Sequence, residues 1–241
     1  MKNAVWDENE MATIQNKDRL LPSQHYFSKM YKGFDFYGDM ERLLGSMYEP
    51  LKLDIKTKEG LTYSCMGSDL NTLHFLQFLI RSHGYKKVLE LGTYIGVSAM
   101  YMCFAGAIVV TVEKGEEFYS IALSNYMKNG YGTIETPMPI LTINDDAIHY
   151  LENDTDSYGL IFIDCSKESY KELLELSLPR LSPNGMILVD DVFFQGDTLN
   201  QCATSEKGAG VRRMLDYVKT LDGYEKVILP IGNGLLMVRK C

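Results

Sequence analysis

The stretch Lys87-Val-Leu-Glu-Leu-Gly-Thr-Tyr-Ile-Gly96 decides the fold of this chain. Its first half, Lys87 to Leu91, is a mostly apolar run of strand length, and its second half is a turn with a glycine at each end. Glycine allows tight turns and close approaches of the backbone that other residues do not. A strand that ends in such a turn and leads into a helix indicates the opening unit of a parallel α/β sheet.

The rest of the chain continues this alternation of strands and helices. Beyond 87–91, the apolar patterns predict strands at 108–112, 140–143, 160–163, 185–189, 224–229 and 235–238. They predict helices at 69–82, 96–105, 116–128, 146–152, 167–177 and 208–221. The last two strands are joined by Pro230-Ile-Gly-Asn-Gly234, a short connection that favours an antiparallel hairpin. We therefore expect an α/β fold, with a doubly wound, mostly parallel sheet of seven strands that ends in this hairpin.

The beginning of the chain has a different character. Residues 1–33 are polar with aromatic spots and show no clear period, and 35–49 are predicted to form a helix that Pro50 ends. We therefore divide the chain into an N-terminal helical and aromatic extension or lid, 1–60, and a folded domain, 61–241.

The bulk composition narrows the class of protein. The chain has 241 residues, 46% of them hydrophobic, and a net charge of −8, which suits one large α/β domain. The acidic balance disfavours a partner that is held through many phosphates, such as a nucleic acid. Five scattered cysteines without a CxxC pair argue against a disulfide framework or a zinc site, and favour the cytoplasm. No apolar run reaches the ~18 residues of a membrane span, and no signal peptide is recognisable.

Acidic residues stand where five of the predicted strands end. They are Glu90, Glu113, Asp145-Asp146, Asp164 and Asp190-Asp191. In an open parallel sheet, ligands bind beyond the carboxyl ends of the strands, so these side chains should surround one pocket. Such a pocket suits a cofactor that carries a ribose and a positive charge, together with a divalent ion.

The first two of these acids point to a ribose. Glu113 follows Glu90 by 23 residues and ends the next strand, the usual place of an acid that accepts both ribose hydroxyls. The spacing of Gly92 and Gly96 is G-x-x-x-G, not the G-x-G-x-x-G of dinucleotide sites, which disfavours a nicotinamide oxidoreductase. The alternatives are a glycine turn without a ligand and a solvated acid at 113. Asp146-Ala147 would face the adenine or cap a helix, and the two roles are compatible.

The later acids point to a metal. Neighbouring parallel strands would bring Asp164 close to Asp190 and Asp191, and three clustered carboxylates call for a cation. Oxygen ligands suit Mg²⁺, Ca²⁺ or Mn²⁺. The alternative is that one aspartate caps a helix and another points to water. Lys167, one helical turn after Asp164, would act either as a general base with a lowered pKa or as the partner of a salt bridge to these aspartates.

Three segments together carry a resemblance to a known family. They are Val88-Leu-Glu-Leu-Gly-Thr-Tyr-Ile-Gly-Val-Ser-Ala-Met100, Ile161-Phe-Ile-Asp-Cys-Ser-Lys167 and Leu188-Val-Asp-Asp-Val192. They resemble motifs of the cation-dependent, S-adenosylmethionine-using O-methyltransferases of the catechol and caffeoyl-CoA type. The resemblance covers 64–240 and implies the Rossmann-like methyltransferase fold.

The resemblance also implies a role for individual residues. Those around S-adenosylmethionine would be Met66, Gly67, Glu90, Gly92, Tyr94, Gly96, Ser98, Glu113, Asp146, Ala147 and Asp164. Asp164, Asp190 and Asp191 would hold the divalent ion, Lys167 would be the base, and Asp164 would share in catalysis. This chain departs from the family at Asp191, where the family usually has Asn, and at Ser166, which is often Asp or an aromatic residue.

These roles predict metal-dependent methyl transfer to a hydroxyl oxygen of a small catechol-like acceptor, in a cytoplasmic protein that forms a homodimer as relatives often do. One alternative is methylation of a hydroxylated tRNA base, for which Lys207, Arg212 and Arg213 would make a local basic patch. Another is a cofactor-binding interaction module without catalysis. Acceptor specificity would come from 25–50 and 193–208, and the aromatic segment 25–37 would form a lid or pack against the sheet or a second subunit.

Overall fold

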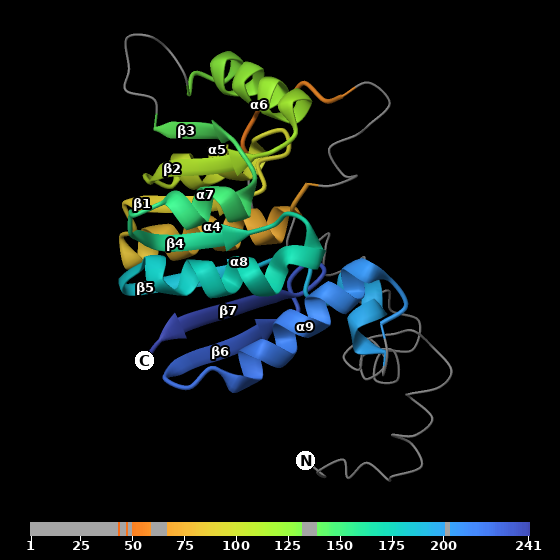
Figure 1. Cartoon of the computed structure of the whole chain (residues 1–241). Coiled ribbons are helices and arrows are strands. Elements are labelled where there is room, and N and C mark those ends of the chain that lie inside the picture. Colours follow the sequence, from red (N-terminus) through yellow and green to blue (C-terminus); the bar gives the residue numbers. More distant parts are fainter. Residues whose placement is uncertain (1–42, 44–46, 48–49, 59–66, 132–138, 201–202) are drawn as a thin grey trace. The chain divides into compact units, whose positions relative to one another are not determined.

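The structure is a computed structural model that describes residues 43, 47, 50–58, 67–131, 139–200 and 203–241 (Figure 1). Leu43 and Met47 are helical, in agreement with the helix predicted there, but the rest of 35–49, the aromatic segment 25–37 and Met66 lie outside the described residues. The following description therefore concerns the domain that begins at Pro50.

Seven strands form one sheet in the order β3-β2-β1-β4-β5-β7-β6, from top to bottom in Figure 1. The first five strands along the chain run parallel, whereas β7 runs antiparallel to both β5 and β6. This confirms the predicted sheet and its closing hairpin. The strands are β1 (Lys87–Leu91), β2 (Ile108–Glu113), β3 (Ile140–Asn144), β4 (Tyr158–Ile163), β5 (Leu181–Val189), β6 (Tyr224–Leu229) and β7 (Leu235–Lys240).

Helices cover both faces of the sheet. One face packs against α4 (Leu70–His83), α5 (Val97–Phe104) and α6 (Glu116–Lys128). The other packs against α7 (Ala147–Asn153), α8 (Tyr170–Ser177) and α9 (Glu206–Thr220), which lie in front of the sheet in Figure 1. Three short 3-10 helices complete the described elements: η2 (Lys167–Ser169), η3 (Leu178–Arg180) and η4 (Phe194–Leu199).

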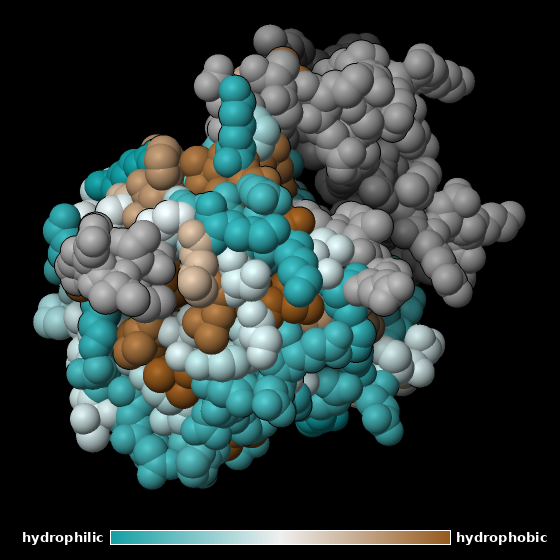
Figure 2. Space-filling model, turned by 90° about the horizontal axis from the view of Figure 1, so that it is seen from above, coloured by the Kyte–Doolittle hydropathy of each residue, from teal (hydrophilic) through white to brown (hydrophobic). Residues whose placement is uncertain are grey.

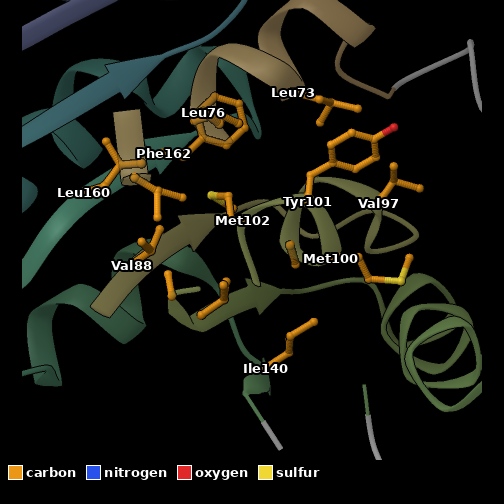
Figure 3. Packing of buried hydrophobic residues seen from close by; sticks show 14 of the residues in the cluster. Leu73, Leu76, Val88, Val97, Met100, Tyr101, Met102, Ile140, Leu160 and Phe162 are labelled. Atoms are coloured by element: carbon orange, nitrogen blue, oxygen red, sulfur yellow. The ribbon is translucent and has the colours of Figure 1, made fainter. Parts of the chain in front are cut away.

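Because both faces are covered, the central strands are apolar almost throughout. Along β1, Val88 belongs to the core on the α4 side and Leu89 to the core on the α8 side, and both are fully buried. Figure 3 shows the first of these cores, where Leu76 of α4 and Met102 of α5 lie near Phe162 of β4. The face seen in Figure 2 is mostly hydrophilic, with separate apolar patches.

Some element boundaries differ from the sequence prediction. The helix predicted at 167–177 is a 3-10 turn followed by α8, and β5 begins at Leu181 instead of 185. The segment 50–58 belongs to the domain, because the Leu51 amide donates to the Tyr101 hydroxyl at 3.0 Å and the Lys56 amide to Asn125 Oδ1 at 2.7 Å. The compact unit that contains this segment begins at Pro50. The division into an extension, 1–60, and a domain, 61–241, stays a prediction.

Three predicted helix ends are confirmed. Asp69 caps the start of α4, where its side chain accepts hydrogen bonds from two backbone amides, and Gly84 ends this helix with a left-handed backbone. Asp146 caps α7 in the same way as Asp69 caps α4. Among the described residues, no helix is both long and apolar enough to cross a membrane.

Candidate functional site

A cavity of about 450 Å³ lies beyond the carboxyl ends of the parallel strands. It is lined by the turns that follow β1, β2, β3, β4 and β5, and by the loop between β6 and β7. Eight of the residues predicted for the site line it: Gly92, Tyr94, Glu113, Asp146, Ala147, Asp164, Lys167 and Asp191. The structure thus places the ribose-binding candidate and two of the three metal-ligand candidates around one space.

The backbone around this cavity is unusual. Five non-glycine residues in the described part of the chain have positive φ angles, and four of them line the cavity: Tyr94, Asp191, Phe194 and Gln195. Such conformations are costly and concentrate at functional sites. Asp191 has φ 59°, a conformation that Asn and Asp tolerate better than other residues with a side chain. The backbone therefore accepts an aspartate at this position, where the resemblance leads one to expect an asparagine.

Gly92 and Gly96 are required by packing. A Cβ at Gly92 would lie 2.1 Å from the backbone oxygen of Asp164, and one at Gly96 would lie 2.5 Å from the Tyr126 ring. Both glycines also have positive φ angles, 104° and 86°. Gly92 lets the ends of β1 and β4 approach each other, which brings Asp164 to the cavity. Both glycines are thus needed for the packing of the fold. Of the two, only Gly92 is among the described residues that line the cavity.

Glu113 is held in place by the backbone. The Tyr94 amide donates to its Oε2 at 2.9 Å and the Gly115 amide to its Oε1 at 2.8 Å. Each carboxylate oxygen accepts through two lone pairs, so both retain acceptor capacity toward the cavity. This arrangement differs from a solvated surface acid and is suited to binding two neighbouring hydroxyl groups.

An apolar region lies beside Glu113. The rings of Tyr94 and Phe118 pack with their centroids 5.0 Å apart, and both residues line the cavity with Ala147 and Ile148. Asp146 closes this end, where its Oδ1 accepts from the Ile148 amide at 2.9 Å as the helix cap. This region can hold an aromatic ring. The sequence analysis did not find Phe118, which stands in the first helical turn after Glu113.

Glu90 lies behind the cavity lining. It is fully buried, and it accepts hydrogen bonds from the hydroxyls of Ser98 and Thr111. Burial, which outweighs these hydrogen bonds, and the nearby charges of Asp164 and Glu113 raise the pKa of Glu90 to about 8. The Glu90 carboxyl is therefore protonated near neutral pH unless a positive charge lies nearby.

Lys167 bridges two of the predicted metal ligands. Its Nζ lies 2.9 Å from Asp164 Oδ1 and 2.8 Å from Asp191 Oδ2. Burial alone would lower the pKa of Lys167, but Tyr170 and the two carboxylates raise it above its ordinary value. Two roles were predicted for Lys167, a general base and a salt-bridge partner, and the structure shows the salt bridge. Lys167 is an ammonium here and is not ready to accept a proton.

Asp190, the third predicted ligand, is not among the described residues that line the cavity. It is 4% exposed, and its Oδ1 accepts from the Asp191 amide at 2.8 Å. Burial, followed by the charges of Asp164 and Asp191, raises the pKa of Asp190 well above its ordinary value. No group of three Asp, Glu, His or Cys side chains in the described part of the chain is arranged to hold a metal ion.

The donor set nevertheless fits a hard cation by its chemistry. Oxygens of Asp164 and Asp191 converge on one positively charged group, and a third carboxylate lies near enough to feel both charges. Carboxylate oxygens are the ligands that Mg²⁺, Ca²⁺ and Mn²⁺ prefer. The metal site therefore stays a prediction that these residues allow.

The remaining predicted residues lie around this framework. Three of the predicted residues are not among the described residues that line the cavity: Gly67, Gly96 and Ser98. Ser68, next to Gly67, donates through its hydroxyl to Asp164 Oδ2 at 3.3 Å. Other residues line the cavity without having been singled out as site residues, among them Lys114, Phe118, Phe194, Gln195, Lys207 and Asn233. Phe194, Gln195 and Lys207 lie in the segment 193–208, which was predicted as a whole to set acceptor specificity, whereas Asn233 comes from the loop between β6 and β7.

The basic patch considered for tRNA is largely engaged within the protein. Arg212 Nη1 donates to the carbonyls of Thr198 at 2.9 Å and Asn200 at 2.6 Å, and Arg213 Nη2 donates to that of Glu168 at 3.3 Å. Lys207, by contrast, lines the cavity. The two arginines thus hold the backbone at Glu168, Thr198 and Asn200.

Comparison with known proteins agrees with this architecture. A family profile described as O-methyltransferase matches residues 47–241. Caffeoyl-CoA O-methyltransferase 2 of Zea mays is 27% identical over 74% of this chain and 71% of its own length. Catechol O-methyltransferase of Niastella koreensis is 28% identical over 58% of this chain and 64% of its own length.

Solved structures share the fold. The S-adenosylhomocysteine-bound methyltransferase PaMTH1 of Podospora anserina aligns with a TM-score of 0.68 over 100% of both chains, at 20% identity. An O-methyltransferase of Bacillus cereus, also in complex with S-adenosylhomocysteine, aligns with a TM-score of 0.64 over 90% of this chain and 96% of its own, at 20% identity. The family match covers most of the chain, and the chain therefore belongs to the O-methyltransferase family, in the class of the caffeoyl-CoA and catechol enzymes.

Proposed function

We propose that this enzyme transfers a methyl group from S-adenosylmethionine to a hydroxyl oxygen of a small catechol-like acceptor, and that the reaction needs a divalent ion. One observation carries the proposal: Glu113 and the cluster of Asp164, Lys167 and Asp191 line the same cavity. A ribose anchor and a charged reaction centre are thus within one space. The S-adenosylhomocysteine bound in the solved relatives supports this choice of cofactor.

The cofactor would occupy the end of the cavity near β1, β2 and β3. Glu113 would accept the two ribose hydroxyls, because the Tyr94 and Gly115 amides already fix its carboxylate. Asp146, Ala147 and the Phe118 ring would border the adenine. The positively charged methionine part would lie near Gly92, where the buried Glu90 would ionise in response to that charge.

The divalent ion would be held by Asp164, Asp190 and Asp191. It would supply Lewis acidity that lowers the pKa of an acceptor hydroxyl. Lys167 would lose its bridging role once the charges of its two carboxylate partners were offset. Its pKa would then fall, since burial alone lowers it, and its Nζ would become able to take up the hydroxyl proton.

The aspartate at 191 would modify this chemistry. A third carboxylate adds negative charge, which favours tighter binding of a divalent ion and reduces the Lewis acidity that the acceptor experiences. We therefore propose that this chain holds its metal more firmly than an Asp191→Asn variant. Metal titrations of the two proteins would compare the dissociation constants directly.

The proposed function is tested by methyl transfer from labelled S-adenosylmethionine to a panel of catechols. Activity with Mg²⁺ and its loss in excess chelator, restored by added Mg²⁺, is the expected result. Undiminished activity in excess chelator would refute the metal dependence. Failure to methylate any catechol, with S-adenosylhomocysteine still bound, would refute the acceptor class.

A further inference from the structure

Two segments that are far apart in the sequence meet at the acceptor end of the cavity. The segment 192–196 follows β5, and 230–234 connects β6 with β7. The Val192 amide donates to the Gly234 carbonyl at 2.9 Å, and the Phe193 amide to the Asn233 carbonyl at 2.8 Å. These two backbone hydrogen bonds dock the hairpin loop against the chain just beyond the proposed metal ligands.

A third contact in this joint comes from a side chain. The Gln195 amide donates to Asn233 Oδ1 at 3.0 Å, and both residues line the cavity together with Phe194. Phe194 and Gln195 have φ angles of 40° and 54°. A left-handed conformation is unfavourable for such residues and persists only where the surroundings fix it. Asn233 Oδ1 is a contact that does so for Gln195.

The loop that carries Asn233 is itself firmly supported. A Cβ at Gly234 would lie 2.6 Å from the Phe193 ring, and one at Gly232 would lie 2.0 Å from Oδ2 of Asp69, the cap of α4. The loop is therefore packed closely on both sides. Asn233 is presented from a rigid base, which a positioning residue needs.

Phe194 and Gln195, which form one wall of the cavity, are also held in place from the side of Thr198, which is a second anchor in addition to Asn233. Thr198 Oγ1 lies 2.8 Å from the Val192 carbonyl and 2.9 Å from the Phe193 carbonyl, so its single O–H is shared between them. Both anchors leave the ring of Phe194 and the exposed side chain of Gln195 between them, at the cavity. The position of this wall thus depends on Asn233 and Thr198, and of the two only Asn233 is among the described residues that line the cavity.

We infer that Asn233 is a positioning residue that sets the size of acceptor the enzyme accepts, by holding Gln195 and Phe194 as a fixed wall. This inference rests on the proposed function, since it assigns that wall to the acceptor. Without the Asn233 oxygen, Gln195 relaxes toward negative φ and the wall moves. Small catechols are then bound less well, and catechols with a bulky ring substituent gain relative to them.

The test compares Asn233→Ala with Asn233→Asp, because aspartate keeps the acceptor oxygen that the Gln195 amide requires. The ratio of kcat/KM for catechol to that for a bulky catechol is expected to fall about tenfold in Asn233→Ala, mainly through KM, and to stay within twofold in Asn233→Asp. The dissociation constant of S-adenosylhomocysteine is expected to stay unchanged in both. Asn153→Ala, at the exposed end of α7, is the matched control.

Amide hydrogen exchange tests the role of Asn233 independently of methyl-transfer activity. The peptide covering 192–196 is expected to exchange at least fivefold faster in Asn233→Ala than in wild type or Asn233→Asp, while 88–98 stays unchanged. Unchanged exchange, or an unchanged selectivity ratio, overturns the inference. If no catechol is methylated by the wild type, the proposed function fails, and the exchange measurement still decides whether Asn233 holds the wall.

Discussion

The two ends of the cavity are built in different ways. The proposed cofactor end comes from turns that directly follow β1, β2 and β3, so that its lining residues lie within about 60 positions of one another, from Gly92 to Ile148. The proposed acceptor end is joined from the loop after β5 and the hairpin loop at 230–234. The turns after consecutive parallel strands thus supply one end, and backbone and side-chain contacts between distant loops supply the other. We expect substitutions at the end near β1, β2 and β3 to affect binding of the cofactor. We expect substitutions in the loops at 192–196 and 230–234 to affect which acceptor is used.

The largest expected effect is at the boundary between the two ends. Asp164→Ala removes a proposed metal ligand and a partner of Lys167, so the methyl-transfer rate should fall on the order of a thousandfold, as for other preorganised charged groups. Cofactor binding should weaken far less, because Glu113 remains. Turnover and calorimetric binding of S-adenosylhomocysteine check the two expectations.

Asp222→Ala is the matched control for this variant, since Asp222 lies in the turn before β6, outside the cavity lining. It should keep wild-type turnover. If Asp164→Ala retained more than a tenth of the activity, Asp164 would have no central part in the chemistry.

The next effect concerns the framework of the cofactor end. Gly92→Ala places a Cβ 2.1 Å from the Asp164 backbone, whereas Gly84→Ala meets nothing within 4 Å, and both glycines have positive φ. Strain alone should cost Gly84→Ala about 1 kcal/mol of unfolding free energy. Crowding should bring the cost of Gly92→Ala to roughly 2–5 kcal/mol. Equal losses in denaturant unfolding would show that the close approach of β1 and β4 is not needed.

A smaller effect concerns pH. The pKa of Glu90 is raised on folding from 4.5 to about 8, so the folded state holds a proton that the unfolded chain releases. The resulting stability is fully present below pH 4.5 and is lost as pH rises through about 8. The unfolding free energy without cofactor should therefore fall across this range, and should fall less in Glu90→Gln.

Cofactor binding should show the opposite trend. Because the cofactor carries positive charge, it is bound more tightly when Glu90 is ionised, so affinity should rise with pH up to about 8. The rise should be at most about tenfold per pH unit. Calorimetric titrations of wild type and Glu90→Gln with S-adenosylmethionine between pH 6 and 8.5 would show it. Equal slopes for the two proteins would mean that the charge of Glu90 does not reach the cofactor.

The same contrast explains which parts of the fold and of the site could be predicted from the sequence. Strands with continuous apolar runs and a glycine turn after the first of them identified the sheet, and the strand ends then located Glu113 and Asp164 at one edge. That inference needs only the rule that parallel strands end on the same side. The shared position of these strand ends around one cavity was therefore largely predictable.

Acceptor specificity was predicted for the segment 193–208 as a whole, but the individual contacts at the proposed acceptor end were not predictable in this way. The contact between Gln195 and Asn233 joins residues 38 positions apart through a side-chain oxygen, and no period or motif marks either of them. The positive φ angles of Phe194 and Gln195 are likewise unexpected, because neither residue favours them. The state of Lys167 was left open between two roles, since its pKa depends on burial and on both carboxylate neighbours.

A crystal structure with S-adenosylhomocysteine and Mg²⁺ tests the central claim most directly. The account predicts the ribose hydroxyls on Glu113 and an ion bound by Asp164 and Asp191, with Lys167 no longer spanning these two carboxylates. Lys167 still bridging both at millimolar Mg²⁺ without density for an ion, or the nucleoside bound away from Glu113, would contradict it.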